Sequence, residues 1–440
     1  MKKSTLVFLA ILCSFFSEAQ LKNKANLDKL FTSFEKENKA MGTVSIFKDG
    51  NEVYTKSIGF ANIELAKKAD DLTKYRIGSI TKTFTASIIF QLIDEGKLAL
   101  NTLVSKYFPE VPNSNKITIK NLLYHRSGLY NITREKGFHV WISKPRNRKK
   151  MLTKIVKHPV DFQPNEKTAY SNTNYILLSF IAEKIDKKSF SKIIKNRISK
   201  PLKLDRTHFG KKIKIKKNEA TSYYWENSKW NPITIETNLK GPMGAGAIVS
   251  TAKEVNIFYN KLFTGKLISK NSLEKMITPI NEMGMGISVI NYRGILIYGH
   301  DGGIDGFRSI AAYIPKKKLS IAFTFNASNI PSTGTLVQIL ETYFRNDTSV
   351  INVSKSKLKT ADLDKYLGVY SNNSFPAKVT VTKKGNILYA QATGQPIFEL
   401  TATKAHVFKY APLNIILAFK PLKKSLNLKF NGRNHLLAKE

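Results

Sequence analysis

The sequence predicts a mixed α/β fold of the α+β type, followed by a small all-β domain at the C-terminal end. Two observations support this prediction. Runs with strand composition at 42–47 and 53–60 precede a helical middle, and strand composition returns after Gly294. Beyond a polar stretch at about 346–360, short strand-like runs follow one another closely. The chain of 440 residues is long enough for two or three domains.

The first half of the chain predicts a helix, a hairpin and a second helix. An amphipathic helix begins near Leu27, and the turn Lys48-Asp49-Gly50-Asn51 joins the first two strands. Apolar residues recur at helical spacing over 80–92, and Gly96 stands where a left-handed residue would end that helix. The second helix therefore begins directly after Ser79.

The second half predicts more helices and then mainly strands. The basic segment 130–157 shows no clear period, so we expect it to form an irregular rim of a cleft. A helix follows Tyr170-Ser171-Asn172, and another begins with a cap at Ser250-Thr251. The expected strands are 295–299, 307–314 and 319–325, then 366–370, 377–382, 387–393, 415–419 and 426–430.

The composition describes a globular protein with a strong basic bias. Hydrophobic residues make up 42% of the chain, which is enough for a large core. The net charge of +39 comes from 71 Lys and Arg against 32 Asp and Glu, spread along the whole length. No zinc-finger spacing or aromatic RNA-binding motif accompanies the lysines, so we expect no nucleic-acid partner. Attraction to an anionic cell envelope is compatible with this charge.

The N-terminus has the pattern of a secretory signal peptide. Met1-Lys2-Lys3 is basic, residues 6–16 are apolar, and Ala19 precedes the expected cleavage point. We therefore expect residues 1–19 to be removed and the protein to be secreted or periplasmic. The single cysteine, Cys13, would leave with this segment, so the mature protein would have no disulfide and no thiolate metal site. No later apolar run is long enough to span a membrane.

Ser79 is the candidate nucleophile. It stands at the start of a helix, where free backbone N–H groups and the helix dipole favour an oxyanion, and Lys82 follows one turn later. The spacing alone decides nothing, because a helix N-cap serine would give the same pattern. Ser-x-x-Lys also occurs at Ser33/Lys36, Ser189/Lys192, Ser250/Lys253 and Ser272/Lys275.

Three separated motifs carry a family resemblance. They are Ser79-Ile80-Thr81-Lys82, Tyr170-Ser171-Asn172 and His300-Asp301-Gly302. In order and spacing they resemble the motifs of the serine β-lactamase-like superfamily, which includes class C β-lactamases, D-alanyl-D-alanine carboxypeptidases, D-aminopeptidases and esterases. The resemblance covers about 42–326, and the last eighty or so residues resemble the lipocalin-like β-barrel appended to many such hydrolases.

The resemblance implies a fold and a domain plan. The expected catalytic domain, 20–345, has an antiparallel five-stranded sheet flanked by helices, plus a helical subdomain. A linker would occupy 346–360 and a small β-barrel 361–440. A second Tyr-Ser-Asn stands at Tyr370-Ser371-Asn372, at the end of an expected barrel strand, where we expect a buried structural tyrosine.

The resemblance also implies the chemistry. Ser79 would be the nucleophile, and either Lys82 or Tyr170 would be the general base. Asn172 would orient Lys82 and a substrate amide. His300, Gly302 and Gly303 would bind substrate, with the backbone N–H groups of Ser79 and Gly303 as the oxyanion hole. We expect no cofactor and no metal, since no histidine stands at a metal-ligand spacing.

Two departures from the family pattern bear on the substrate. His300 and Asp301 stand where Lys and Thr are usual, so the motif lacks a permanent positive charge and carries a negative one. This weakens the case for a substrate carboxylate, and therefore for penicillins. Asn165 replaces the usual glycine after Pro164, and asparagine also tolerates a left-handed turn.

These observations favour a secreted serine hydrolase that works through an acyl-enzyme. The bond would be an ester, a D-amino-acid or peptidoglycan-type amide, or a β-lactam-like amide. The alternatives are a catalytically silent sensor or wall-binding protein of the same fold, and a basic protein that adheres to the cell envelope. The expected partner is a small-molecule or peptide substrate, including peptidoglycan-derived peptides, and the oligomeric state is left open.

Overall fold

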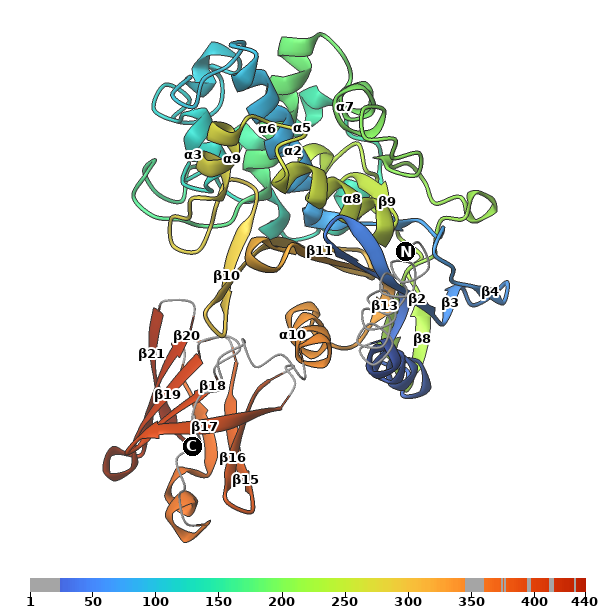
Figure 1. Cartoon of the computed structure of the whole chain (residues 1–440). Coiled ribbons are helices and arrows are strands. Elements are labelled where there is room, and N and C mark those ends of the chain that lie inside the picture. The colour runs from blue at the N-terminus through green and yellow to red at the C-terminus, as the bar shows by residue number, and fades with distance from the viewer. Residues whose placement is uncertain are drawn as a thin grey trace, which may run out of the picture. The chain divides into compact units, whose positions relative to one another are not determined.

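The computed structural model describes residues 24–344, 360–372, 375, 377–393, 397–410, 415–430 and 433–440. The expected signal peptide lies outside these residues, as does the expected linker up to 359. The described chain forms two compact units (Figure 1). The first extends to Val289 and includes Tyr298–Asn329, and the second comprises Ile290–Ile297 and Ile330–Glu440. Within the described residues, no helix has the length and apolarity needed to cross a membrane.

The chain has a large sheet with helices packed on it, which confirms the predicted α+β class. The sheet has six strands, however, where five were expected. The additional strand, β10, lies at the edge of the sheet beside β11, and the turn Arg293-Gly294 joins the two. Both turn residues have positive φ, as a two-residue hairpin requires. The strand order is β10-β11-β12-β13-β1-β2, with bounds Ser288–Tyr292, Ile295–Ile304, Phe307–Ile314, Leu319–Ser328, Ala40–Lys48 and Asn51–Ile58.

The N-terminal elements form as local sequence predicts. An N-terminal helix over 24–36 buries Leu27, Phe31 and Phe34. β1 and β2 pair antiparallel across a turn in which Asp49 and Gly50 have positive φ. β1 is buried along almost its whole length because it lies between β13 and β2.

The helices pack around α2, the helix that follows Ser79. Eleven of its residues are buried, so α2 is enclosed on more sides than its predicted apolar stripe suggested. It contacts α6 and α9, while α8 packs on β1, β12 and β13 (Figure 1). The bounds are Thr81–Asp94 for α2, Ile119–Leu123 for α3, Phe138–Ser143 for α4, Arg148–Val156 for α5, Asn172–Asp186 for α6, Phe190–Ile194 for α7, Ala252–Phe263 for α8, Lys270–Ile277 for α9 and Ser332–Tyr343 for α10.

The segment 130–157 is more regular than expected. It contains a 3₁₀ turn, Ile132–Arg134, and the helices α4 and α5. Only Met151 and Ile155 of α5 are buried, one turn apart, and the basic residues between and around them conceal this short helical period. The expectation of an irregular rim was therefore wrong for this segment.

The second unit contains a closed eight-stranded barrel, of which the sequence predicted five strands. The missed strands are β17, β18 and β21. β17 and β21 mix polar with apolar residues, and β18 has only four residues, Val-Phe-Lys-Tyr. Tyr370 lies in β14, is 2% exposed, and donates to the carbonyl oxygen of Tyr366. Strands β14 to β21 are Gly368–Ser371, Val379–Lys384, Ile387–Ala392, Phe398–Lys404, Val407–Tyr410, Ile415–Lys420, Ser425–Phe430 and Arg433–Lys439.

Candidate active site

Ser79 lies in a tight 3₁₀ turn, Gly78–Ile80, that leads directly into α2. The short strand β5 (Tyr75–Arg76) precedes this turn and holds it in place by pairing with β9 (Ile248–Ser250). Arg76 is buried and fixes the base of the turn, because its guanidinium contacts the carboxylates of Glu236 and Asp305 at 2.6 Å each. Ser79 is not the N-cap of this turn or of α2, since those positions are Ile77 and Ile80. Its hydroxyl contacts Lys82 and Tyr170 instead.

Lys82 points its amine at the Ser79 hydroxyl. Its Nζ lies 3.0 Å from Oγ of Ser79, 2.8 Å from Oδ1 of Asn172 and 2.8 Å from the carbonyl oxygen of Ala245. The Ala245 carbonyl comes from a 3₁₀ turn, Met243–Ala245, that packs against α2 and α6. A Cβ on Gly244 would meet the Tyr175 carbonyl oxygen at 2.7 Å, so glycine allows this turn to enter between the helices.

The ammonium form of Lys82 is disfavoured. The residue is fully buried, and burial lowers its pKa from about 10.5 to about 7, while the negative charge of Asp301 acts in the opposite direction. Lys82 is therefore a mixture of amine and ammonium near neutral pH. An amine carries the lone pair that a general base needs.

Tyr170 approaches Ser79 from the other side. Its hydroxyl donates to Oγ of Ser79 at 2.9 Å, although 40% of the residue is exposed. Burial of the phenol group raises the pKa of Tyr170, the Ser79 hydrogen bond lowers it, and Asp301 raises it. The net shift is upward, so the phenol stays protonated at neutral pH.

Asn172, the first residue of α6, is held in one orientation. Its Nδ2 donates to Oδ1 of Asn131 at 3.4 Å and to Oγ1 of Thr133 at 3.2 Å, and its backbone N–H donates to the same Asn131 oxygen at 3.1 Å. These contacts turn the Asn172 side-chain oxygen toward Lys82.

The third motif lies in β11, next to the nucleophile turn. A Cβ built on Gly78 would lie 2.7 Å from the Gly303 nitrogen, and one on Gly302 would lie 2.0 Å from the Ile77 carbonyl oxygen. Ser309 of β12 fixes the same contact by donating to the Ile77 oxygen at 2.9 Å. The two backbones therefore touch only because Gly78 and Gly302 lack side chains.

His300 is buried beside this contact. Its ring centroid lies 6.2 Å from that of Tyr170, and its Nδ1 lies 2.6 Å from the carbonyl oxygen of Asp301. Burial lowers the pKa of His300, and the charge of Asp301 opposes this shift. The structure thus brings all seven predicted site residues to one place, from α2, α6, β11 and the turns beside them.

Three contributors were missed or left undecided by the sequence. His125 was given no role in the site from the sequence, yet it is buried and its ring lies 4.5 Å from that of Tyr170, centroid to centroid. Asn131 and the Ala245 carbonyl had no distinctive signal. Asn131 belongs to a segment without a clear period, and a backbone carbonyl leaves no trace in residue type.

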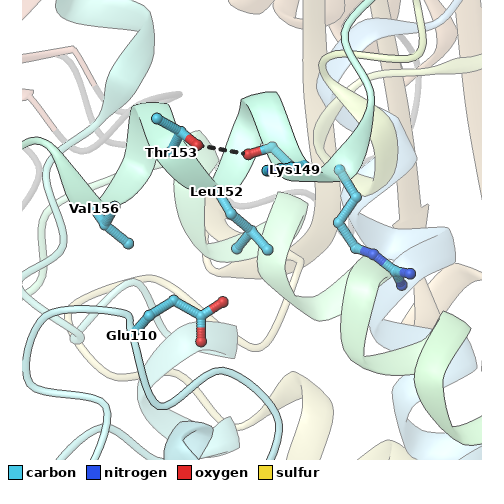
Figure 2. A pocket seen from close by; sticks show the side chains of 6 residues that line it. Glu110, Lys149, Leu152, Thr153 and Val156 are labelled. Atoms are coloured by element: carbon cyan, nitrogen blue, oxygen red, sulfur yellow. Dashed lines mark hydrogen bonds between the residues drawn. The ribbon is translucent and has the colours of Figure 1, made fainter.

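A cavity of about 290 Å³ lies elsewhere in the first unit and is separate from this site. Figure 2 shows its lining side chains on α5 and on the loop that carries Glu110. Arg148, Lys149, Leu152, Thr153 and Val156 complete the lining. It contains none of the residues that surround Ser79. Among the described residues, no group of three or more His, Cys, Asp or Glu could hold a metal ion.

Comparison with known proteins places these residues in context. The family described as Beta-lactamase matches residues 27–337. The Bacillus subtilis (strain 168) protein PbpX is 30% identical over 323 residues, which are 73% of this chain and 79% of that protein. Its name describes it as a penicillin-binding protein. The teichoic acid D-alanine hydrolase of Staphylococcus aureus is 29% identical over 238 residues, 54% of this chain and 56% of that protein.

A solved structure agrees with these sequence relatives. The D-stereospecific amidohydrolase from a Streptomyces species is 27% identical, with a TM-score of 0.60. The likeness covers 74% of this chain and 98% of the amidohydrolase chain.

Proposed function

This chain belongs to the Beta-lactamase family, and from this premise we propose that it is a secreted serine hydrolase that forms an acyl-enzyme on Ser79. The single observation that carries the proposal is the position of the Ser79 hydroxyl, between the Lys82 amine at 3.0 Å and the Tyr170 hydroxyl at 2.9 Å. The bonds cleaved would be esters or amides of D-amino-acid, peptidoglycan-type or β-lactam-like compounds. Export rests on the signal-peptide pattern of residues 1–19.

Lys82 is the proposed general base, and an inventory of hydrogens supports it. A neutral amine has two hydrogens and one lone pair. The oxygens of Asn172 and Ala245 can only accept, so they take the two hydrogens. The lone pair is then left for the Ser79 hydroxyl, the third neighbour of Nζ. Attack would transfer the hydroxyl proton to Lys82 as the bond from Oγ to the substrate carbonyl carbon forms.

Tyr170 is the proposed proton donor to the leaving group. Its raised pKa keeps the phenol protonated, and its hydroxyl already lies against Ser79. Once the tetrahedral intermediate collapses, the leaving group takes a proton, and the Tyr170 hydroxyl and the Lys82 ammonium are the donors beside it. Water would then attack the acyl-enzyme, activated by the same groups, and release the acid and free Ser79.

The oxyanion would be stabilised by the backbone N–H groups of Ser79 and Gly303. The close approach of Gly78 to Gly303 supports this assignment, because it brings the Gly303 backbone next to the turn that carries Ser79. The donors belong to the backbone of a turn and of a strand, so they need no rearrangement when charge develops on the substrate oxygen.

A fluorophosphonate probe and hydrolysis assays test the proposal. Wild-type protein should be labelled and should hydrolyse at least one of p-nitrophenyl acetate, D-alaninamide and nitrocefin, and Ser79→Ala should do neither. Ser189→Ala is the matched control, because Ser189 belongs to a second Ser-x-x-Lys pattern but caps α7. Labelling of the wild type without turnover would identify a catalytically silent sensor instead. Labelling that persists in Ser79→Ala would refute the assignment of Ser79 as the nucleophile.

A further inference from the structure

The third motif presents hydrogen-bond acceptors to the site. The contact between His300 Nδ1 and the Asp301 carbonyl oxygen fixes the tautomer of the ring, because a carbonyl oxygen can only accept. Nδ1 therefore carries the proton, and in the neutral ring Nε2 keeps a lone pair. This Nε2 is buried and has no hydrogen-bond partner among the described residues. A buried acceptor without a partner is costly, so a donor from the substrate would satisfy it.

Asp301 adds a second acceptor, which is charged. Its side chain is 70% exposed and its Oδ1 lies 3.7 Å from the His300 ring. Within the described part of the chain, no Lys or Arg lies within 4.0 Å of this carboxylate. Among the residues that the structure describes, the exposed Asp301 carboxylate therefore has no lysine or arginine ion-pair partner.

The position of Asp301 along β11 places it near the reacting bond. Side chains alternate along a strand, so Asp301 and Gly303 lie on the same side of β11, roughly 7 Å apart along it. Gly303 in turn abuts Gly78, the residue before Ser79. The charge of Asp301 raises the pKa of both Lys82 and Tyr170, so its carboxylate is close enough to act on groups beside the nucleophile. A cation attached next to the scissile carbonyl would be attracted to it.

We propose that this site selects acyl donors with a free ammonium group on the carbon next to the scissile carbonyl, namely α-amino esters and α-amino amides. This inference rests on the proposed hydrolase function of Ser79. Asp301 supplies the counter-charge, and Nε2 of His300, whose side chain lies on the other face of β11, accepts a hydrogen bond from a different donor of the substrate. The same carboxylate repels nearby anionic groups, such as the carboxylate that penicillins and peptides cleaved at a free C-terminus carry on the leaving-group side of the scissile bond.

Arg308 is the nearby cation that would argue for the opposite preference. It is the cross-strand neighbour of Gly303, and its Nη1 lies 3.5 Å from a Cβ built there. However, the same Nη1 already donates to the carbonyl oxygens of Asp305 and Phe307, at 3.3 and 2.8 Å. A site for substrate carboxylates would depend on Arg308, and a site for ammonium would depend on Asp301.

The test compares three amides that differ only at the carbon next to the carbonyl: D-alaninamide, N-acetyl-D-alaninamide and D-lactamide. At about pH 7 the first carries an ammonium, and the other two are neutral. Hydrolysis (kcat/KM) is measured, together with the protection that each compound gives Ser79 against fluorophosphonate labelling. We expect the wild-type protein to favour D-alaninamide, and Asp301→Asn to reduce that preference over D-lactamide about tenfold.

The controls separate this inference from the function beneath it. Asp205→Asn removes an equal charge from an exposed turn and should leave the preference unchanged. Taking ratios between substrates cancels any common effect of Asp301 on Lys82. Equal treatment of all three amides, or a preference that depends on Arg308→Gln and ignores Asp301→Asn, would overturn the inference while Ser79 labelling and ester hydrolysis still upheld the hydrolase. Loss of labelling and hydrolysis in the wild type would instead refute both.

Discussion

The imidazole ring of His125 lies against the phenol ring of Tyr170, with centroids 4.5 Å apart and planes inclined by 33°. His125 is 1% exposed and has a left-handed φ of +56°. Its Nδ1 accepts from the backbone N–H of Ser171 at 3.1 Å and from Nδ2 of Asn174 at 3.3 Å, so the ring is neutral with its proton on Nε2. Burial lowers the pKa of His125 well below its usual range, in agreement with that state. His125 therefore supports the segment that carries Tyr170.

Replacing His125 should impair catalysis more than binding. His125→Asn removes the ring that contacts the Tyr170 phenol. A small displacement of the Tyr170 hydroxyl should lower kcat about tenfold or more, while KM changes little. The two constants, kcat and KM, are measured separately with a p-nitrophenyl ester. The control is His139→Asn, at an exposed position of α4. A rise in KM at unchanged kcat would contradict a positioning role.

The pH dependence of turnover should follow Lys82. Because its pKa is about 7, the fraction of neutral amine rises with pH, so kcat/KM for an uncharged ester should increase through about pH 7 and then level off. Asp301 raises the pKa of Lys82, so Asp301→Asn should move this limb to lower pH. The pH–rate profiles of the wild-type protein and Asp301→Asn check this. A rise in kcat/KM that moves to higher pH in the variant would exclude Lys82 as the base.

Tyr170 and Tyr370 belong to identical Tyr-Ser-Asn motifs and should respond differently to the same change. Tyr170→Phe removes the hydroxyl beside Ser79 and should lower the acylation rate on the order of a hundredfold, with little effect on Tm. Tyr370→Phe removes a buried bond to the Tyr366 carbonyl and should cost about 1 kcal/mol of stability without affecting acylation. Stopped-flow acylation and thermal unfolding measure the two effects, and similar kinetics for both variants would refute the assignment.

Gly302 and Gly303 should also differ, although they are neighbours. A Cβ at Gly302 would meet the Ile77 carbonyl oxygen at 2.0 Å and Oγ of Ser309 at 2.4 Å, whereas one at Gly303 would meet only Arg308 side-chain atoms at 3.5 Å or more. Gly302→Ala should therefore displace the nucleophile turn and cost about 1–3 kcal/mol, while Gly303→Ala should unfold at nearly the wild-type temperature. Equal Tm values for the two variants would contradict the close contact of β11 with this turn.

The sequence by itself determined the features that depend on neighbouring residues. The spacing of apolar residues gave the position of α2, and Gly96 has the left-handed φ of +69° that its place after the helix required. Asn165 has the φ of +68° expected from the Pro-Asn turn, and β12 has the predicted bounds. These features are local because φ preference and periodicity act within a few residues. The order of the three motifs also predicted the family, since residue types alone carry it.

The tertiary structure decided everything that depends on distant segments. Lys82 contacts Asn172, 90 residues away, and the Ala245 carbonyl, 163 residues away, and its burial in that setting lowers its pKa. The barrel closes through the pairing of β14 with β21, two strands at opposite ends of the barrel's sequence. His125 acquired its place beside Tyr170 in the same way. Contacts of this kind leave no local pattern, because a side chain's environment is created only when remote segments pack against it.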